Sequence, residues 1–416
     1  MTPTSRADAH VASADHEIIY LLAPCGHPNY GDEFIVRAWL RHLARVRPRA
    51  EVIVDCHTPG QAAVLLADAH PTVTFVDTMW RICFQTAELP ISEAVAVASA
   101  VVSDPGRMPT LVSGIELLTR ADSVHLVGGG YINAVWPHHL VLVATAAAVA
   151  ERSGARLFAT GQGLIPVGGP ERQALLIEAA QRFDKFDVRD DSSYDALVEL
   201  GESRSHTGDD AWLGVNDPDV YDQASEAVRR DVVLCLQSDL MEDFAGGRGI
   251  DGLVEVASEL VKTWRLDGAD VAFVEGIPGA DRVVFDRIAH LLPGIEFVPF
   301  SHLWRAGLPA RPGQTWVTTR FHHHLLAAAR GASGIALAGR TDYYPLKHLT
   351  LARCGSRWLV TGSGDLPDAP VRAGGFASET VEAMARRKCA LADELYPRRP
   401  RGLRRVVRAL RAASPG

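Results

Sequence analysis

Short apolar runs alternate with longer amphipathic stretches along most of the chain. In the first half, the apolar runs fit buried strands at 18–23, 52–55, 73–76, 124–127, 157–160 and 186–188. Between most of them, apolar residues recur at helical spacing: in 34–46, Ile35, Trp39, Leu40 and Leu43 share one face and arginines occupy the other. This alternation predicts parallel strands joined by crossover helices, as in a doubly wound α/β sheet.

The second half repeats the pattern, with strands expected at 232–236, 271–274, 295–298, 316–318, 335–337 and 358–360. A loop at 208–226, rich in Asp, Gly and Pro, separates the halves. We therefore predict two Rossmann-like domains, at 17–225 and 226–365, that face each other across a cleft, where such sheets bind ligands. The remaining segments are expected to be a mobile tail at 1–16, a helix at 366–396 that packs back, and a basic tail at 397–416.

Length, charge and cysteine usage narrow the class of protein. A chain of 416 residues is longer than one hydrophobic core usually supports, which agrees with two domains. The formal net charge of −8 argues against nucleic-acid binding, because neutralising phosphates requires a basic surface. The six cysteines show neither CxxC nor Cys/His spacing, so we predict no zinc site and no disulfide framework, and expect reduced, mostly buried thiols.

The two ends of the chain and its longest apolar run indicate where in the cell the protein is found. The first 17 residues are polar and lack the apolar core of a secretory signal, and the longest apolar run, 140–150, is too short to span a bilayer. We expect a cytoplasmic protein. The arginine-rich tail leaves two interpretations open: an amphipathic helix that contacts the inner face of the membrane, or a solvated tail.

Glycine-rich segments follow several predicted strands. Asn29-Tyr30-Gly31-Asp32 stands between the first strand and the first helix, where backbone N–H groups favour an anion. The alternative there is an ordinary turn in which Asp32 caps the helix. Three glycines, 128–130, and then Gly161-Gln162-Gly163 follow two later strands, and we interpret both as places where the backbone approaches substrate closely.

Charged residues follow other strands. Arg189 either reaches an anion or pairs with Asp190, and Asp191 and Ser192 are candidate caps for the next helix. Asp209 and Asp210 are interpreted as caps, with a functional carboxylate as the alternative. Lys347 is either a placed charge or a solvated side chain.

The run Arg320-Phe321-His322-His323-His324 also follows a strand. Successive helical residues point about 100° apart, so the three adjacent histidines cannot share one metal, and we predict no metal site here. Arg320 and His322 can instead converge on one ligand. The guanidinium would clamp phosphate or carboxylate, and the imidazole would exchange a proton near neutral pH.

Taken in order, these segments, together with Ser193, Tyr344 and Lys347, resemble the polysaccharide pyruvyl transferase family over residues 18–350. The resemblance implies a glycosyltransferase-B-like fold and transfer of pyruvate from phosphoenolpyruvate, as co-substrate, onto two hydroxyls of a saccharide or glycolipid, giving a ketal and phosphate without a cofactor or metal. It implies His322 as general acid and Arg320 as anion clamp. The predicted donor-binding residues are Asn29, Gly31, Asp32, Gly129, Gly130, Gln162, Gly163, Arg189, Gln237, Arg340 and Lys347, and the predicted acceptor-binding residues are Tyr131, Asn133, Trp136, His138 and Tyr344.

One position departs from the family. Many members end the first strand of the second domain with an arginine that can hold the donor, whereas this chain has Gln237, which cannot replace a guanidinium. Either Arg340, Arg189 or Lys347 supplies that charge, or the donor is not phosphoenolpyruvate. Two alternatives therefore stand beside pyruvyl transfer: a transferase that uses a nucleotide-linked donor on the same fold, and a non-catalytic binding relative.

Overall fold

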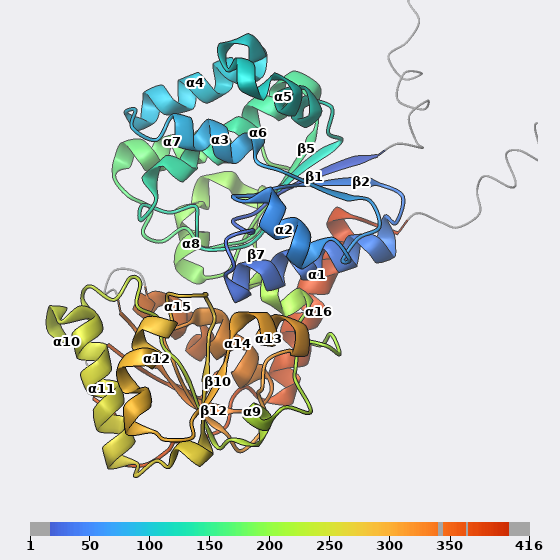
Figure 1. The fold of residues 1–416 in the computed structure, drawn as a ribbon. Coiled ribbons are helices and arrows are strands. Elements are labelled where there is room, and N and C mark those ends of the chain that lie inside the picture. Colours follow the sequence, from blue (N-terminus) through green and yellow to red (C-terminus); the bar gives the residue numbers. More distant parts are fainter. Residues whose placement is uncertain (1–16, 340–343, 363–364, 399–416) are drawn as a thin grey trace, which may run out of the picture.

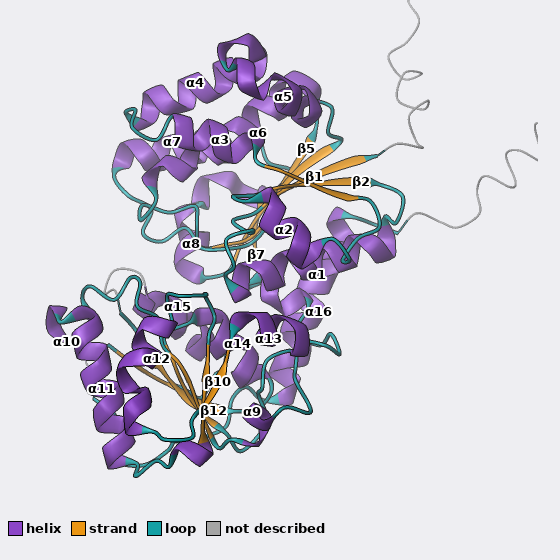
Figure 2. Ribbon diagram, in the orientation of Figure 1, coloured by secondary structure: helices purple, strands orange, loops and turns teal. Residues whose placement is uncertain are grey.

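The computed structural model describes residues 17–339, 344–362 and 365–398, and its described strands form two parallel sheets. The first has the order β3-β2-β1-β4-β5-β6-β7 and the second β10-β9-β8-β11-β12-β13 (Figures 1 and 2). The first sheet comprises β1 (Ile18–Leu22), β2 (Glu51–Asp55), β3 (Val73–Val76), β4 (Ser123–Leu126), β5 (Arg156–Gln162), β6 (Lys185–Val188) and β7 (Arg204–His206). The second comprises β8 (Val232–Cys235), β9 (Val271–Val274), β10 (Glu296–Val298), β11 (Thr315–Thr318), β12 (Ser333–Leu337) and β13 (Leu359–Thr361).

Helices cover both faces of the first sheet. One face packs against α3 (Thr78–Gln85), α4 (Ile91–Ser103), α5 (Val112–Thr119), α6 (Leu140–Ser153) and α7 (Pro170–Ala180), and the other against α1 (Tyr30–Val46) and α2 (Pro59–Leu66) (Figure 1). Alternate residues of β1 divide between these two cores, since Tyr20 faces the first group and Leu21 the second. The short helix α8 (Asp191–Ala196) follows β6.

The second sheet is covered in the same way. On one side lie α11 (Gly249–Thr263) and α12 (Arg282–Ile288), and on the other α13 (Phe300–Ala306), α14 (Phe321–Ala329) and α15 (Tyr344–Arg353). The short helices α9 (Glu226–Arg229) and α10 (Phe244–Gly247) lie near the ends of β8. The last helix, α16 (Ser378–Leu395), shares one continuous hydrophobic core with α1 and α14, so this core joins the two halves.

The order of strands reverses between β1 and β4 in the first sheet and between β8 and β11 in the second. Parallel sheets bind ligands beyond the carboxyl ends of strands at such a reversal. The segment 29–32 follows β1, Gly128–Gly130 follow β4, Gln237 follows β8, and Arg320 follows β11. The topology therefore places these segments at the reversal points of the two sheets.

The predicted fold class, two doubly wound Rossmann-like domains, is confirmed. Two local predictions were wrong. Helix α1 begins at Tyr30 rather than at 34, and its N-cap is Asn29, whose side chain accepts from the N–H of Gly31, rather than Asp32. Helix α8 is capped by Asp190, which accepts from the N–H of Ser193 at 2.8 Å, and not by Asp191 or Ser192.

Two further expectations concern membranes and the basic tail. Among the described helices, none combines the length and the apolar character needed to cross a bilayer. The basic segment 399–416 lies outside the described residues, as does Arg340, so the expected tail contact with a membrane stays a prediction.

Candidate active site

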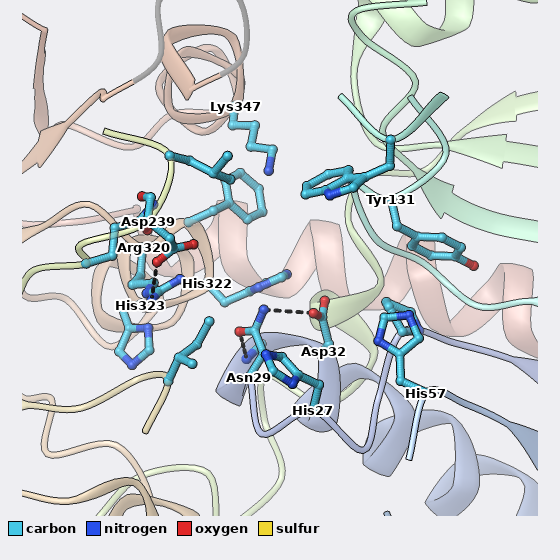
Figure 3. Close-up of a pocket in the computed structure, with 18 of the residues that line it drawn as sticks. His27, Asn29, Asp32, His57, Tyr131, Asp239, Arg320, His322, His323 and Lys347 are labelled. Carbon is cyan, nitrogen blue, oxygen red and sulfur yellow. Dashed lines mark hydrogen bonds and ion pairs between the residues drawn. The ribbon is translucent and has the colours of Figure 1, made fainter. Parts of the chain in front are cut away.

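A cavity of about 350 Å³ opens between the two sheets where their strand orders reverse (Figure 3). Loops after β1 and β4 form one wall, and the loops after β8 and β11 form the other. Its lining includes Asn29, Gly31, Asp32, Gly130, Tyr131, Trp136, Arg189, Gln237, Arg320, His322 and Lys347 from the predicted set. The sequence motifs thus converge on one cavity, although they are spread over more than 300 residues.

His322 crosses from the second half to the first. It stands in the first turn of α14, and its Nε2 lies 3.5 Å from Oδ1 of Asp209, a residue of the first half. On its other side the imidazole is packed against Gly31, where a Cβ would come within 1.8 Å of Nδ1. Gly31 is therefore required because any side chain there would occupy the place of the His322 ring.

Asp209 is held as an ionised carboxylate. Burial alone raises its pKa, but the neighbouring His322 and Arg189 lower it well below the usual range. Its Oδ1 also accepts from the N–H of Ala211 at 2.9 Å, which confirms the predicted capping role. The Asp209 carboxylate thus places a buried negative charge beside the imidazole of His322 at the cavity wall.

Arg320 is anchored in its own half of the molecule. Its Nε and Nη2 donate to the carboxylate of Asp281, which is fully buried, and Nη2 also donates to Oδ1 of Asp239 at 3.0 Å. The guanidinium still lines the cavity, as Figure 3 shows. Its charge is shared with two carboxylates, so Arg320 is a weaker anion clamp than the sequence predicts.

Two other cations line the cavity. Arg189 is buried, with Nη1 3.5 Å from Oδ2 of Asp209 and Nε 3.8 Å from Oδ2 of Asp190, so its pairing with Asp190 is present, and its contact with a bound anion stays a prediction. Lys347 extends toward His322 (Figure 3). Burial and the charge of Arg189 lower the pKa of Lys347 well below its usual value. A bound anion would favour the charged form of Lys347, since an opposite charge raises the pKa of an amine.

The glycine-rich segments have a different role from the one predicted. A Cβ on Gly128 would lie 2.7 Å from the carboxylate of Asp210, one on Gly129 would lie 2.7 Å from the ring of Tyr131, and one on Gly163 would lie 2.4 Å from Nε of Arg189. These glycines make room for protein side chains. Of these three and Gly130, the cavity lining in the described structure includes only Gly130, so we correct the predicted donor contacts of Gly129 and Gly163 to supporting contacts.

Gln162 and Asn133 also bind groups of the protein itself. The amide of Gln162 donates to the carbonyls of Leu126, Val127 and Thr160, and the amide of Asn133 binds within its own loop, to the carbonyl of Gly130 and the N–H of Val135. Both side chains are fully buried and hold the loops that shape the cavity. Neither side chain is part of the cavity lining in the described structure, so their predicted contacts with donor or acceptor stay untested predictions.

The predicted acceptor-binding residues are only partly brought together. Trp136 lines the cavity, and Tyr131 does so with its ring, but its hydroxyl donates to the carbonyl of Val127 at 2.8 Å. His138 points its ring toward Phe84, with centroids 6.1 Å apart, and is not part of the cavity lining in the described structure. The side chain of Tyr344 lies outside the described residues.

Sequence reasoning missed several lining residues. His27, His57, His139 and Asp239 line the cavity without belonging to a glycine motif. Burial lowers the pKa of His57 to about 4 and that of His139 to about 3, so both rings are neutral at pH 7. His57, His139 and Trp136 form a neutral aromatic end of the cavity lining, and Arg189 and Lys347 form a basic end.

Comparisons with known proteins identify a family from the sequence and a fold from the structure. A family model described as polysaccharide pyruvyl transferase matches residues 29–339. Among solved structures, the putative UDP-N-acetylglucosamine 2-epimerase of Listeria monocytogenes gives a TM-score of 0.51 at 12% identity over 92% of both chains. The S. aureus MnaA–UDP complex gives 0.50 at 12% identity over 91% of this chain and 89% of the other. At such identity these likenesses show the fold alone, which is that of glycosyltransferase-B-like enzymes. No curated protein gives a significant match.

Proposed function

Because the chain belongs to the polysaccharide pyruvyl transferase family, and is therefore a polysaccharide-modifying transferase, we propose that it moves pyruvate from phosphoenolpyruvate onto two hydroxyls of a saccharide or glycolipid. The product is a ketal and the leaving group is phosphate. The observation that carries the proposal is the His322–Asp209 pair, whose side chains lie 3.5 Å apart at the wall of a cavity that Arg189 and Lys347 also line.

The chemistry begins with a proton. The protonated imidazole of His322, stabilised by Asp209, gives its proton to the methylene carbon of phosphoenolpyruvate, whose double-bond electrons form the new C–H bond. The adjacent carbon becomes oxocarbenium-like, and an acceptor hydroxyl attacks it and returns its proton to His322. Phosphate leaves as the second hydroxyl adds, and it takes up that hydroxyl's proton, so one donor and two hydroxyls give one ketal and one phosphate.

The two ends of the cavity suit the two substrates. Arg189 carries a positive charge and a bound anion would favour the charged form of Lys347, and such charges stabilise the charge that develops during the reaction. Trp136, His57 and His139 present neutral aromatic rings to an uncharged sugar. We assign the donor to the first end and the acceptor to the second.

The direct test is product formation. Purified protein, phosphoenolpyruvate and a panel of glycans should release phosphate only when an acceptor is present, and the acceptor should gain one pyruvate ketal that is visible by mass spectrometry and by the methyl resonance in NMR spectra. Phosphate release without any ketal on an acceptor, or no release with any glycan, would contradict the proposal.

A second prediction concerns Gly31. Replacing it with alanine places a Cβ where Nδ1 of His322 now lies, so the ring must move. We expect turnover to fall by about 10²-fold, the loss typical when a reacting group is misplaced by about 1 Å. Gly60→Ala in α2 is the matched control, because a Cβ there meets nothing within 4 Å. Equal turnover in both variants would show that the position of His322 is not critical.

One alternative is favoured by a specific observation. Arg320 is already paired with Asp281 and Asp239, and Gln237 is neutral, so the second half offers less positive charge than a small dianion requires. A nucleotide-linked sugar, whose charge lies on a diphosphate, is therefore the competing donor. Thermal shift with phosphoenolpyruvate and with UDP-sugars separates the two, because a ligand that binds the native state raises Tm.

A further inference from the structure

A cysteine and two histidines meet on the first half of the molecule, behind the part of the cavity wall that Trp136 and His139 form. Cys83 lies on α3, and His138 and His139 belong to a 3₁₀ helix, Pro137–His139, that precedes α6. The cysteine Sγ and one ring nitrogen from each histidine all lie within 4.8 Å of one another. We propose that these three residues bind a zinc ion.

The donor set suits zinc. Thiolate and imidazole are its preferred protein ligands, with Zn–S near 2.3 Å and Zn–N near 2.0–2.1 Å, so ligand atoms around a tetrahedral ion lie about 3.5 Å apart. The cluster needs only a small contraction to reach that spacing. His138 can supply it, because its side chain is only half-buried, whereas Cys83 and His139 are buried.

The hydrogen bond of His139 fixes a tautomer that can bind a metal. Its Nδ1 lies 2.9 Å from the carbonyl oxygen of Tyr131. A carbonyl oxygen only accepts hydrogen bonds, so Nδ1 carries the proton and Nε2 keeps its lone pair. A backbone carbonyl that fixes the tautomer in this way is the usual outer partner of a metal-bound histidine.

Cys83 needs one change to bind. Its thiol now donates to the carbonyl of His138 at 3.4 Å. On binding, the thiol proton passes to solvent and the thiolate coordinates the ion, with water in the fourth position. The bound ion would tie α3 to residues 131–139, the segment that carries Trp136 and His139 to the cavity wall. This proposal does not depend on which donor the enzyme uses.

Cobalt is the probe that reports on these ligands. Full-length protein treated with a chelator and titrated with CoCl₂ should bind one equivalent, with a near-ultraviolet thiolate-to-cobalt absorption band that ZnSO₄ removes by displacement. Cys83→Ser should abolish the band and weaken zinc binding by about 10²-fold or more, and His138→Ala should weaken it by at least about tenfold. Circular dichroism confirms that each variant is folded.

Other cysteines provide the controls. Cys354→Ser changes a half-buried thiol outside the cluster and should leave the band intact. Cys25 and Cys56 lie next to each other and are the competing thiols. A band that survives in Cys83→Ser, or that disappears in Cys25→Ser instead, overturns the assignment, as does a wild-type protein that shows no band.

Discussion

Replacing His322 with glutamine should lower the rate of phosphate release from phosphoenolpyruvate by about 10²- to 10⁴-fold, the range that a positioned general acid contributes. Glutamine keeps the length and the hydrogen-bonding character of the side chain but cannot transfer a proton to carbon. Asp209, at 3.5 Å, then has no cation to stabilise on that side. Steady-state kinetics with a fixed acceptor, together with donor binding measured by thermal shift, separates lost turnover from lost binding.

Two further variants sharpen this result. His290→Gln changes an exposed histidine and should leave the rate within twofold. Asp209→Asn retains the cap on Ala211 in part but removes the negative charge beside the imidazole, so activity should fall. Wild-type turnover in His322→Gln would show that another group delivers the proton, and Lys347 would be the first to test.

Much of the fold could be predicted because buried parallel strands are continuous apolar runs. The run at 271–274 matches β9 residue for residue, and all of its residues are buried. The strand β7 was missed because Arg204, Ser205 and His206 are polar and pair on one side only, with β6. An edge strand of this kind carries no hydrophobic signal.

The sequence could predict which segments form the candidate site, but not which side chains pair with one another there. Segments after strands had to meet at the reversal points, and His322 and Gly31 do so. The partner of each charged side chain could not be predicted, because such partners are distant in sequence. Arg320, for example, donates hydrogen bonds to Asp281 and Asp239, which lie 39 and 81 residues away along the chain. The sequence favours Asp209 only as a cap, but in the structure its carboxylate also lies beside His322, which belongs to the other half.

A substitution in the C-terminal helix should have a large effect on folding stability. Lys388 on α16 is fully buried, with Nζ 2.8 Å from Oδ2 of Asp187 and 2.9 Å from Oδ1 of Asp210, both also fully buried. Lys388→Met should lower the free energy of unfolding by about 3–5 kcal/mol, because it leaves two buried carboxylates without their cation. The expected readout is a lower urea midpoint with an unchanged m-value. Lys262→Met, at an exposed site on α11, should change stability by less than about 0.5 kcal/mol.

The two carboxylates explain why this lysine also matters for the cavity. Asp187 accepts from the N–H groups of Gly161 and Thr207, and Asp210 from the N–H of Gly128, so one cation supports the end of β5 and the loops after β4 and β7.

The pH dependence of this contribution follows from the same contacts. Burial alone lowers the pKa of Lys388, but Asp187 and Asp210 raise it above the usual value. A raised pKa means that the stabilisation is fully present below the ordinary lysine pKa of about 10.4 and is lost only as the pH rises past the folded value. If Lys388→Met unfolds at the wild-type urea concentration at pH 7, then α16 is held by its apolar contacts alone and the loops do not depend on the buried charge.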